Sequence, residues 1–191
     1  IDVNLSKTFD EEKISSNIEN EISDVFKSFD FEKIAPHEKV VEKRFVDAIS
    51  DGIKEAMLKF DELIIMGQDI AEYGGVFKIT EGFVELFGKE RVRNTPICES
   101  SIVEVAMGLS ICNRKSIVEL QFSDFITSGF NPVVNYLAKI HYRWGQNADV
   151  VLRMPCGAGV GAGPFHSQTN EAWFTKTPGS VSYTHLTLPT T

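Results

Sequence analysis

The sequence has 191 residues, 42% hydrophobic and 24% charged, which is enough for one globular domain with a core. Its formal net charge is −8 and it carries no Lys/Arg cluster, so nucleic acid is not an expected partner. It has no apolar run long enough for a transmembrane helix, so no membrane association is expected. Three widely spaced cysteines, Cys98, Cys112 and Cys156, match no zinc or disulfide pattern and favour a cytoplasmic location.

Residues 1–35 form an acidic segment with apolar residues at helical spacing. These apolar positions are Ile14, Ile18, Ile22, Val25 and Phe26. The spacing predicts one amphipathic helix, which ends between Phe31 and Pro36. A short linker to about residue 40 then separates this segment from the rest of the chain.

The next elements alternate between helix and strand. Apolar residues recur every three or four positions from Val40 to Phe60, which predicts a long amphipathic helix. The apolar run 63–66 predicts a strand buried on both faces. A loop over 67–75 follows, and a short helix is expected from Thr80 to Phe87, just before Gly88.

A stiff stretch around Pro96 leads into the following helix and contains Glu99. Ser100 and Ser101 are predicted N-caps, and Glu104 would complete a capping box with Ser101. Glu99 would then lie at the start of a helix that follows an extended segment, where ligands bind in open α/β sheets. Alternatively, its carboxylate only stabilises the helix dipole.

The second half repeats the alternation. Strands are predicted at 117–122 and 149–154, and a helix capped by Asn131, with Pro132 at its first position, is expected to end at Gly145. This order predicts an α/β fold with a doubly wound, mostly parallel sheet over residues 40–179. The Thr-rich residues 180–191 break the pattern and are left out of the predicted fold, with a foreign origin as one explanation.

A glycine-rich loop, residues 157–163, follows the last strand. Its match to a dinucleotide-binding fingerprint is weak, because Pro164 follows at once and no acidic residue stands where a ribose would need one. His166, beyond the loop, is a candidate for proton transfer, or else a hydrogen-bonded structural histidine. Phe125 lies after a strand and either packs in the core or stacks on a flat ring.

Four segments together resemble the beta subunit of the decarboxylating component of 2-oxo acid dehydrogenase complexes. They are MGQDIAEYGGVFKITEG (66–82), NTPICE (94–99), ELQFSDF (119–125) and GAGPFHSQ (161–168). The resemblance covers roughly residues 40–179 and implies the pyrimidine-binding domain of a thiamine diphosphate enzyme.

The resemblance also implies a site. Glu99 matches the glutamate that hydrogen-bonds the cofactor's aminopyrimidine, and Phe125 matches the aromatic residue that stacks on this ring. Gln121 and Ile97 match their neighbours in the pocket. His166 matches the histidine that serves decarboxylation or acyl transfer to lipoamide.

The implied activity is oxidative decarboxylation of a 2-oxo acid, branched-chain favoured and pyruvate next, with acyl transfer to a lipoyl-bearing acyltransferase. The family's Gly-Asp-Gly motif for the diphosphate and magnesium is missing, so an alpha-type subunit or fused segment is expected to supply that half of the site in an oligomer. Residues 1–35 resemble the end of an alpha subunit, which favours a fused chain. Two rival functions are a transketolase- or synthase-like thiamine enzyme and a non-catalytic assembly module.

One departure from the family lies beside the first strand. Gln68 occupies a position where the family usually has glutamate. An amide cannot relay a proton as a carboxylate does, so an acidic proton relay through this position is not expected.

Overall fold

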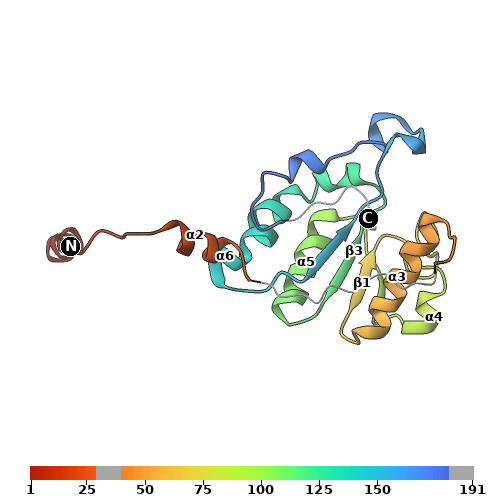
Figure 1. The fold of residues 1–191 in the computed structure, drawn as a ribbon, viewed down its shortest axis with the longest axis horizontal. Helices are drawn as coiled ribbons and strands as arrows, with labels where there is room; N and C mark the ends of the chain where they lie inside the picture. The colour runs from red at the N-terminus through yellow and green to blue at the C-terminus, as the bar shows by residue number, and fades with distance from the viewer. Residues whose placement is uncertain (29–39, 181–191) are drawn as a thin grey trace.

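The computed structural model describes residues 1–28 and 40–180, and its centre is a parallel four-stranded sheet of order β2-β1-β3-β4 (Figure 1). The strands are β1 (Ile64–Gly67), β2 (Val92–Asn94), β3 (Ser116–Glu119) and β4 (Val150–Arg153). Gly67 pairs with Asn94 on one side and with Glu119 on the other, and Glu119 pairs with Arg153. The four strands therefore end at one common edge.

The α-helices of the described residues are α1 (Asp2–Asp10), α2 (Ile18–Val25), α3 (Phe45–Lys59), α4 (Phe83–Phe87), α5 (Glu99–Ile111) and α6 (Ile140–Trp144). Shorter turns of 3-10 or π geometry are η1 (Ser123–Thr127), η2 (Pro132–Tyr136), η3 (Leu137–Lys139), η4 (Ala158–Val160), η5 (Gly163–Phe165) and η6 (Glu171–Trp173). None of the helices within these described ranges is both long and apolar enough to cross a bilayer.

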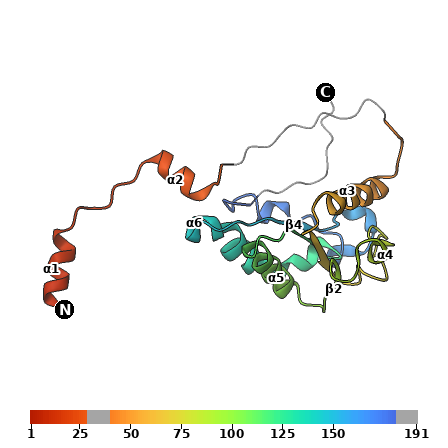
Figure 2. The ribbon, with the colours of Figure 1, turned by 90° about the horizontal axis from the view of Figure 1, so that it is seen from below.

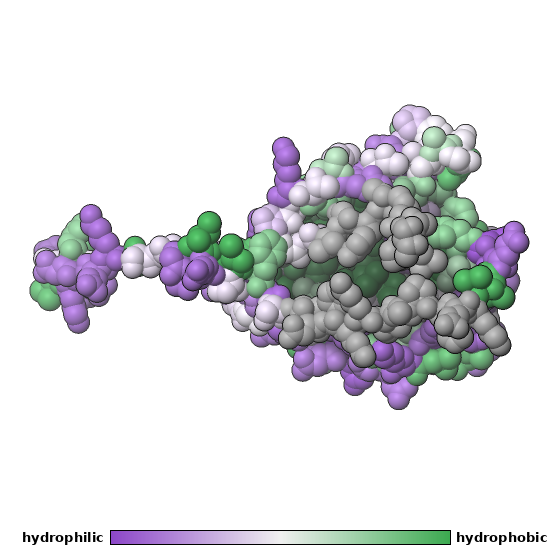
Figure 3. Space-filling view, viewed as in Figure 1, coloured by the Kyte–Doolittle hydropathy of each residue, from purple (hydrophilic) through white to green (hydrophobic). Residues whose placement is uncertain are grey.

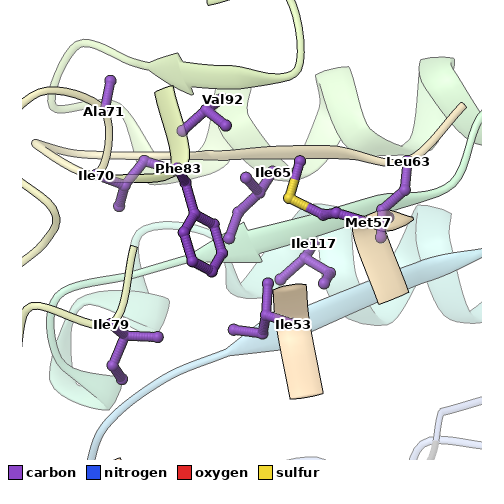
Figure 4. Close-up of a cluster of buried hydrophobic side chains, with 10 residues drawn as sticks. All are labelled: Ile53, Met57, Leu63, Ile65, Ile70, Ala71, Ile79, Phe83, Val92 and Ile117. Carbon is purple, nitrogen blue, oxygen red and sulfur yellow. The ribbon is translucent and has the colours of Figure 1, made fainter. Parts of the chain in front are cut away.

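Helices cover both faces of the sheet (Figures 1 and 2). On one face, side chains of α3, α4, the strands and the loop after β1 form a buried apolar cluster that includes Met57, Ile65 and Phe83 (Figure 4). On the other face, α5 and the helical turns after β3 pack over a second cluster that includes Met66 and Val118. Ile65 and Met66 point to opposite faces, as the period of a strand requires. The structure thus confirms the predicted doubly wound α/β fold.

The N-terminal segment contains two helices where one was predicted. α1 has no buried residue, and α2 is capped by Asn17, whose side chain accepts a hydrogen bond from the backbone N–H of Asn20 at 2.8 Å. The C-cap residue of α1, Glu11, and the N-cap residue of α2, Asn17, both have extended backbone angles, so the two helices are separate. Lys27, just after α2, donates to Asn147 Oδ1 at 2.6 Å, so α2 lies beside α6 (Figure 1). Figure 3 shows a mostly hydrophilic surface on α1 and an apolar patch on α2.

The predicted starts of α3, α4 and α5 are wrong, and α4 begins at Phe83 instead of Thr80. α3 begins at Phe45 instead of Val40, while α5 begins at Glu99 itself with Cys98 as its uncapped N-cap residue, so Ser100 and Ser101 lie inside its first turn. Their capping box is replaced by a 3.5 Å side-chain contact between Ser100 and Glu104. These starts follow from tertiary contacts that a local sequence pattern does not contain.

Asn131 is not an N-cap either. It has helical angles (φ −57°, ψ −52°), and its side chain accepts a hydrogen bond from Asn135 at 2.8 Å, one turn later. The helical turns from Pro132 onward end at Gly145, in the left-handed conformation with φ 64°, as predicted. The predicted end of the first helix near 31–36 and the atypical tail from 181 lie outside the described residues.

Candidate functional site

The carboxyl edge of the sheet is tightly packed. A Cβ atom at Gly67, the last residue of β1, would lie 2.3 Å from the backbone oxygen of Glu119. Only glycine fits there without moving a strand. The backbone N–H of Thr95 donates to the Gly67 oxygen at 2.9 Å, which anchors the chain that approaches α5. The residues that follow β1 and those that begin α5 are therefore held close together.

Glu99 and Gln68 meet at this edge. The Gln68 side chain donates from Nε2 to Glu99 Oε1 at 3.0 Å, and the two residues are 4% and 8% exposed, respectively. Glu99 is also the first residue of α5, where the helix dipole favours a negative charge. A buried carboxylate at the end of a parallel strand, with one oxygen already held, can bind a polar atom of a ligand through its other oxygen.

Phe125 and His166 belong to an aromatic cluster that also contains Phe122 and Phe77. The ring centres of Phe122 and His166 are 5.0 Å apart, and those of Phe125 and His166 are 5.4 Å apart. Phe77 meets Phe122 at 6.1 Å. All these pairs are edge-to-face, an arrangement in which rings attract one another. The structure therefore brings two of the predicted site residues, from distant parts of the chain, into one cluster.

The loop that carries His166 is fastened to η1. Ser123 Oγ donates to the backbone oxygen of Gln168 at 2.7 Å, and Asn170 Nδ2 donates to the backbone oxygen of Ser123 at 2.9 Å. The backbone N–H of Gln168 donates to Asp124 Oδ1 at 3.3 Å. These bonds fix the chain on the far side of the glycine-rich loop.

The other two predicted site residues, Gln121 and Ile97, have surroundings that differ from those of Glu99, Phe125 and His166. Gln121 Nε2 lies 3.5 Å from Oδ2 of Asp69, the residue after Gln68, so the loop after β1 touches both Glu99 and Gln121. Ile97 is 84% exposed, so the structure does not pack it into either group of predicted site residues.

Sequence reasoning missed the pair formed by Glu119 and Arg153 at the ends of β3 and β4. Arg153 Nη2 lies 2.9 Å from Glu119 Oε1, and Glu119 is 3% exposed. Burial raises the pKa of the Glu119 carboxyl, and the positive charge of Arg153 opposes that rise. Gly75, in the left-handed conformation, comes so near that a Cβ there would be 3.2 Å from Glu119 Oε1. The sequence signal for this pair was Glu119, a charged residue among the apolar residues of a predicted strand.

A surface cavity of about 460 Å³ is lined by Thr127, Phe130 and Trp173. Across residues 1–28 and 40–180, no group of three or more His, Cys, Asp or Glu side chains could hold a metal ion.

Known proteins are similar in sequence to this chain over most of its length. Residues 42–191 match the sequence profile of the family described as the transketolase pyrimidine binding domain. The chain is 40% identical over 137 residues to the 2-oxoisovalerate dehydrogenase subunit beta of Bacillus subtilis, a match that covers 71% of this chain and 42% of that protein. It is 36% identical over 146 residues to the pyruvate dehydrogenase E1 component subunit beta of Leifsonia xyli, over 75% of this chain and 43% of that protein.

A third relative is the 3-methyl-2-oxobutanoate dehydrogenase subunit beta of Mycobacterium tuberculosis, 36% identical over 136 residues, which are 70% of this chain and 39% of that protein. The chain thus spans about two fifths of the length of these relatives. The matches confirm the resemblance to beta subunits of 2-oxo acid dehydrogenases. By its fold and by the profile match over most of its length, the chain belongs to the transketolase pyrimidine-binding domain family.

Proposed function

We propose that this chain supplies the pyrimidine side of a thiamine diphosphate site in a 2-oxo acid dehydrogenase. The observation that carries the proposal is the buried Glu99 carboxylate, held on one oxygen by Gln68 at the carboxyl edge of the sheet. The names of the relatives support the same activity.

The residues present fit an aminopyrimidine. This ring is flat and carries nitrogen atoms at its edge, so it needs a polar partner in its plane and an apolar surface on its face. Glu99 would bind a ring nitrogen and hold a proton there, since a carboxylate in a water-poor site interacts more strongly than in bulk water. The half-buried ring of Phe125 would cover the face, with Gln121 as a further neighbour. Ile97, which is exposed in this chain, is proposed as a neighbour in the assembled enzyme.

Thiamine diphosphate, when bound, supplies the nucleophilic carbon and the electron sink that decarboxylation needs. His166 would then move a proton at the reacting centre or assist transfer of the acyl group to lipoamide. Its place in the cluster with Phe122 and Phe125 supports this role, because the edge-to-face contacts orient the imidazole.

We also propose that an alpha-type subunit or fused segment holds the diphosphate and its magnesium ion. The sequence lacks the family's Gly-Asp-Gly motif for these groups, which supports a second half of the site elsewhere. Residues 1–35 are proposed to be the end of such an alpha part, joined to a domain over 40–179. A lipoyl-bearing acyltransferase would accept the acyl group.

The proposed substrate is a branched-chain 2-oxo acid, with pyruvate second. Two of the three relatives described above are named for a branched-chain 2-oxo acid and one for pyruvate. All three cysteines are exposed and free, which supports a location in a reducing compartment such as the cytoplasm.

The proposal is tested in the enzyme assembled with its diphosphate-binding half. Release of carbon dioxide from a branched-chain 2-oxo acid should require thiamine diphosphate and magnesium, and acylated lipoamide should accumulate. A ketose or acetoin-type product formed without lipoamide would point instead to a transketolase-like enzyme. Failure of the assembly to bind thiamine diphosphate would leave a non-catalytic module.

A further inference from the structure

We propose that Gln68 is a positioning residue for Glu99: its amide orients the carboxylate and leaves Oε2 for the cofactor's pyrimidine. This inference rests on the proposed function and adds to it a role for a residue that departs from the family pattern. The evidence is the hydrogen bond of 3.0 Å from Gln68 Nε2 to Glu99 Oε1, between two buried side chains.

Rigid elements hold both partners. Gln68 directly follows Gly67, whose Cα lies against the backbone of Glu119 too closely for any side chain. Glu99 begins α5, and the chain before it is tied to β1 by the bond from Thr95 N–H to the Gly67 oxygen at 2.9 Å. The amide and the carboxylate therefore meet without a mobile loop between them, as a precise ligand site requires.

The chemistry of an amide differs from that of the usual family glutamate. The NH₂ group of Gln68 donates a hydrogen bond at every pH. A carboxyl group in its place would donate only while protonated, and once ionised it would repel Glu99 across the same short distance. Gln68 thus gives the Glu99 carboxylate a hydrogen-bond donor that does not compete with it for a proton.

Each of three other carboxylates has a partner other than Glu99, although Asp124 Oδ2 accepts no hydrogen bond within the described residues. Glu119 is paired with Arg153, Asp69 lies beside the Gln121 amide, and Asp124 accepts a hydrogen bond from the Gln168 backbone. Within the residues that the structure describes, Gln68 is the only side chain that hydrogen-bonds the Glu99 carboxylate. The orientation of Glu99 therefore depends on this one donor.

The test uses the assembled enzyme and measures the Kd of thiamine diphosphate, by calorimetry, from mildly acidic to mildly alkaline pH. The variants are Gln68→Glu, Gln68→Met, which keeps the size of the side chain but has no donor, and Gln146→Glu as a control for added charge on an exposed glutamine. We expect Gln68→Met to bind the cofactor about tenfold more weakly at every pH, as loss of a hydrogen bond to a charged group implies.

Gln68→Glu should bind almost as tightly as wild type at acidic pH, where the two carboxyl groups share a proton, and progressively more weakly as the pH rises. Thermal unfolding without cofactor confirms that each variant is folded. If Gln68→Glu does not fold, Gln68→Met decides the question. Wild-type affinity in Gln68→Met, or a loss in Gln68→Glu that does not change with pH, would overturn the positioning role. A wild-type enzyme that does not bind thiamine diphosphate would instead contradict the proposed function.

Discussion

The imidazole of His166 meets the ring of Phe125 edge-on, with their centres 5.4 Å apart and their planes 81° apart. One residue lies in η1, after β3, and the other follows the glycine-rich loop after β4. The contact therefore links the segment that follows β3 to the segment that follows β4. It also brings His166, the proposed acyl-transfer residue, against Phe125 of the proposed pyrimidine pocket.

His166→Ala should therefore separate cofactor binding from acyl transfer. The variant keeps Glu99 and Phe125, so the Kd of thiamine diphosphate should stay near that of wild type. Acylation of lipoamide should fall by about 10²-fold or more, because proton transfer by a positioned histidine is lost. The measurement is single-turnover acyl transfer in the assembled enzyme.

The matched control is His141→Ala, a histidine of α6 outside the aromatic cluster. It should leave acyl transfer unchanged. Equal effects of the two substitutions, or unchanged transfer in His166→Ala, would remove His166 from the mechanism.

Gly67→Ala should destabilise the fold. Its new methyl group would lie 2.3 Å from the Glu119 backbone oxygen, so β1 and β3 would have to separate. Overpacking of this kind costs about 1–3 kcal/mol in the free energy of unfolding. Urea unfolding measures the loss.

Gly52→Ala provides the contrast. Gly52 lies inside α3 and has open space where a Cβ would stand, so alanine should stabilise the helix by about 0.5–1 kcal/mol. Equal free energies of unfolding for the two alanine variants would contradict the close contact between β1 and β3 at Gly67.

The burial of Glu119, which Arg153 only partly offsets, predicts a dependence of stability on pH. Burial raises the pKa of the Glu119 carboxyl above its ordinary value of 4.5. Between the unfolded and folded pKa values the folded protein binds more protons than the unfolded chain, so its stability falls as the pH rises through this window. Urea unfolding over a pH series from 4.5 upward should show a shallower fall for Glu119→Gln than for wild type.

Arg153→Met leaves the buried Glu119 carboxylate without its cation, and at neutral pH this should cost about 3–5 kcal/mol. A neutral effect of Arg153→Met would show that the pair does not form. Parallel stability curves for wild type and Glu119→Gln would show that burial does not raise the Glu119 pKa.

Much of the fold could be predicted from the chain alone. The apolar run that ends at Met66 belongs to β1, and the alternation of helix and strand predicted a parallel sheet that the structure confirms. Such patterns work because a strand buried on both faces must be apolar along its whole length. The position of Glu99 at the carboxyl edge follows from the same reasoning.

The helix starts could not be predicted in this way. Ser100 and Asn131 have the chemistry of N-caps, yet both lie within helical turns. Long-range contacts could not be predicted from the sequence either. The hydrogen bond from Gln68 to Glu99 and the ion pair of Glu119 with Arg153 depend on the register of strands that are distant in the chain. A cap is local, whereas these contacts exist only once the sheet has formed.

The most direct test of the whole account compares Glu99→Gln with Glu104→Gln in the assembled enzyme. Glu104 lies on the same helix but is exposed, so its substitution should leave activity unchanged. Glu99→Gln should fold, because an amide oxygen can still accept from Gln68, but thiamine-diphosphate-dependent release of carbon dioxide should fall by at least about 10²-fold. Near-normal decarboxylation in Glu99→Gln would contradict the assignment of Glu99 as the centre of the site.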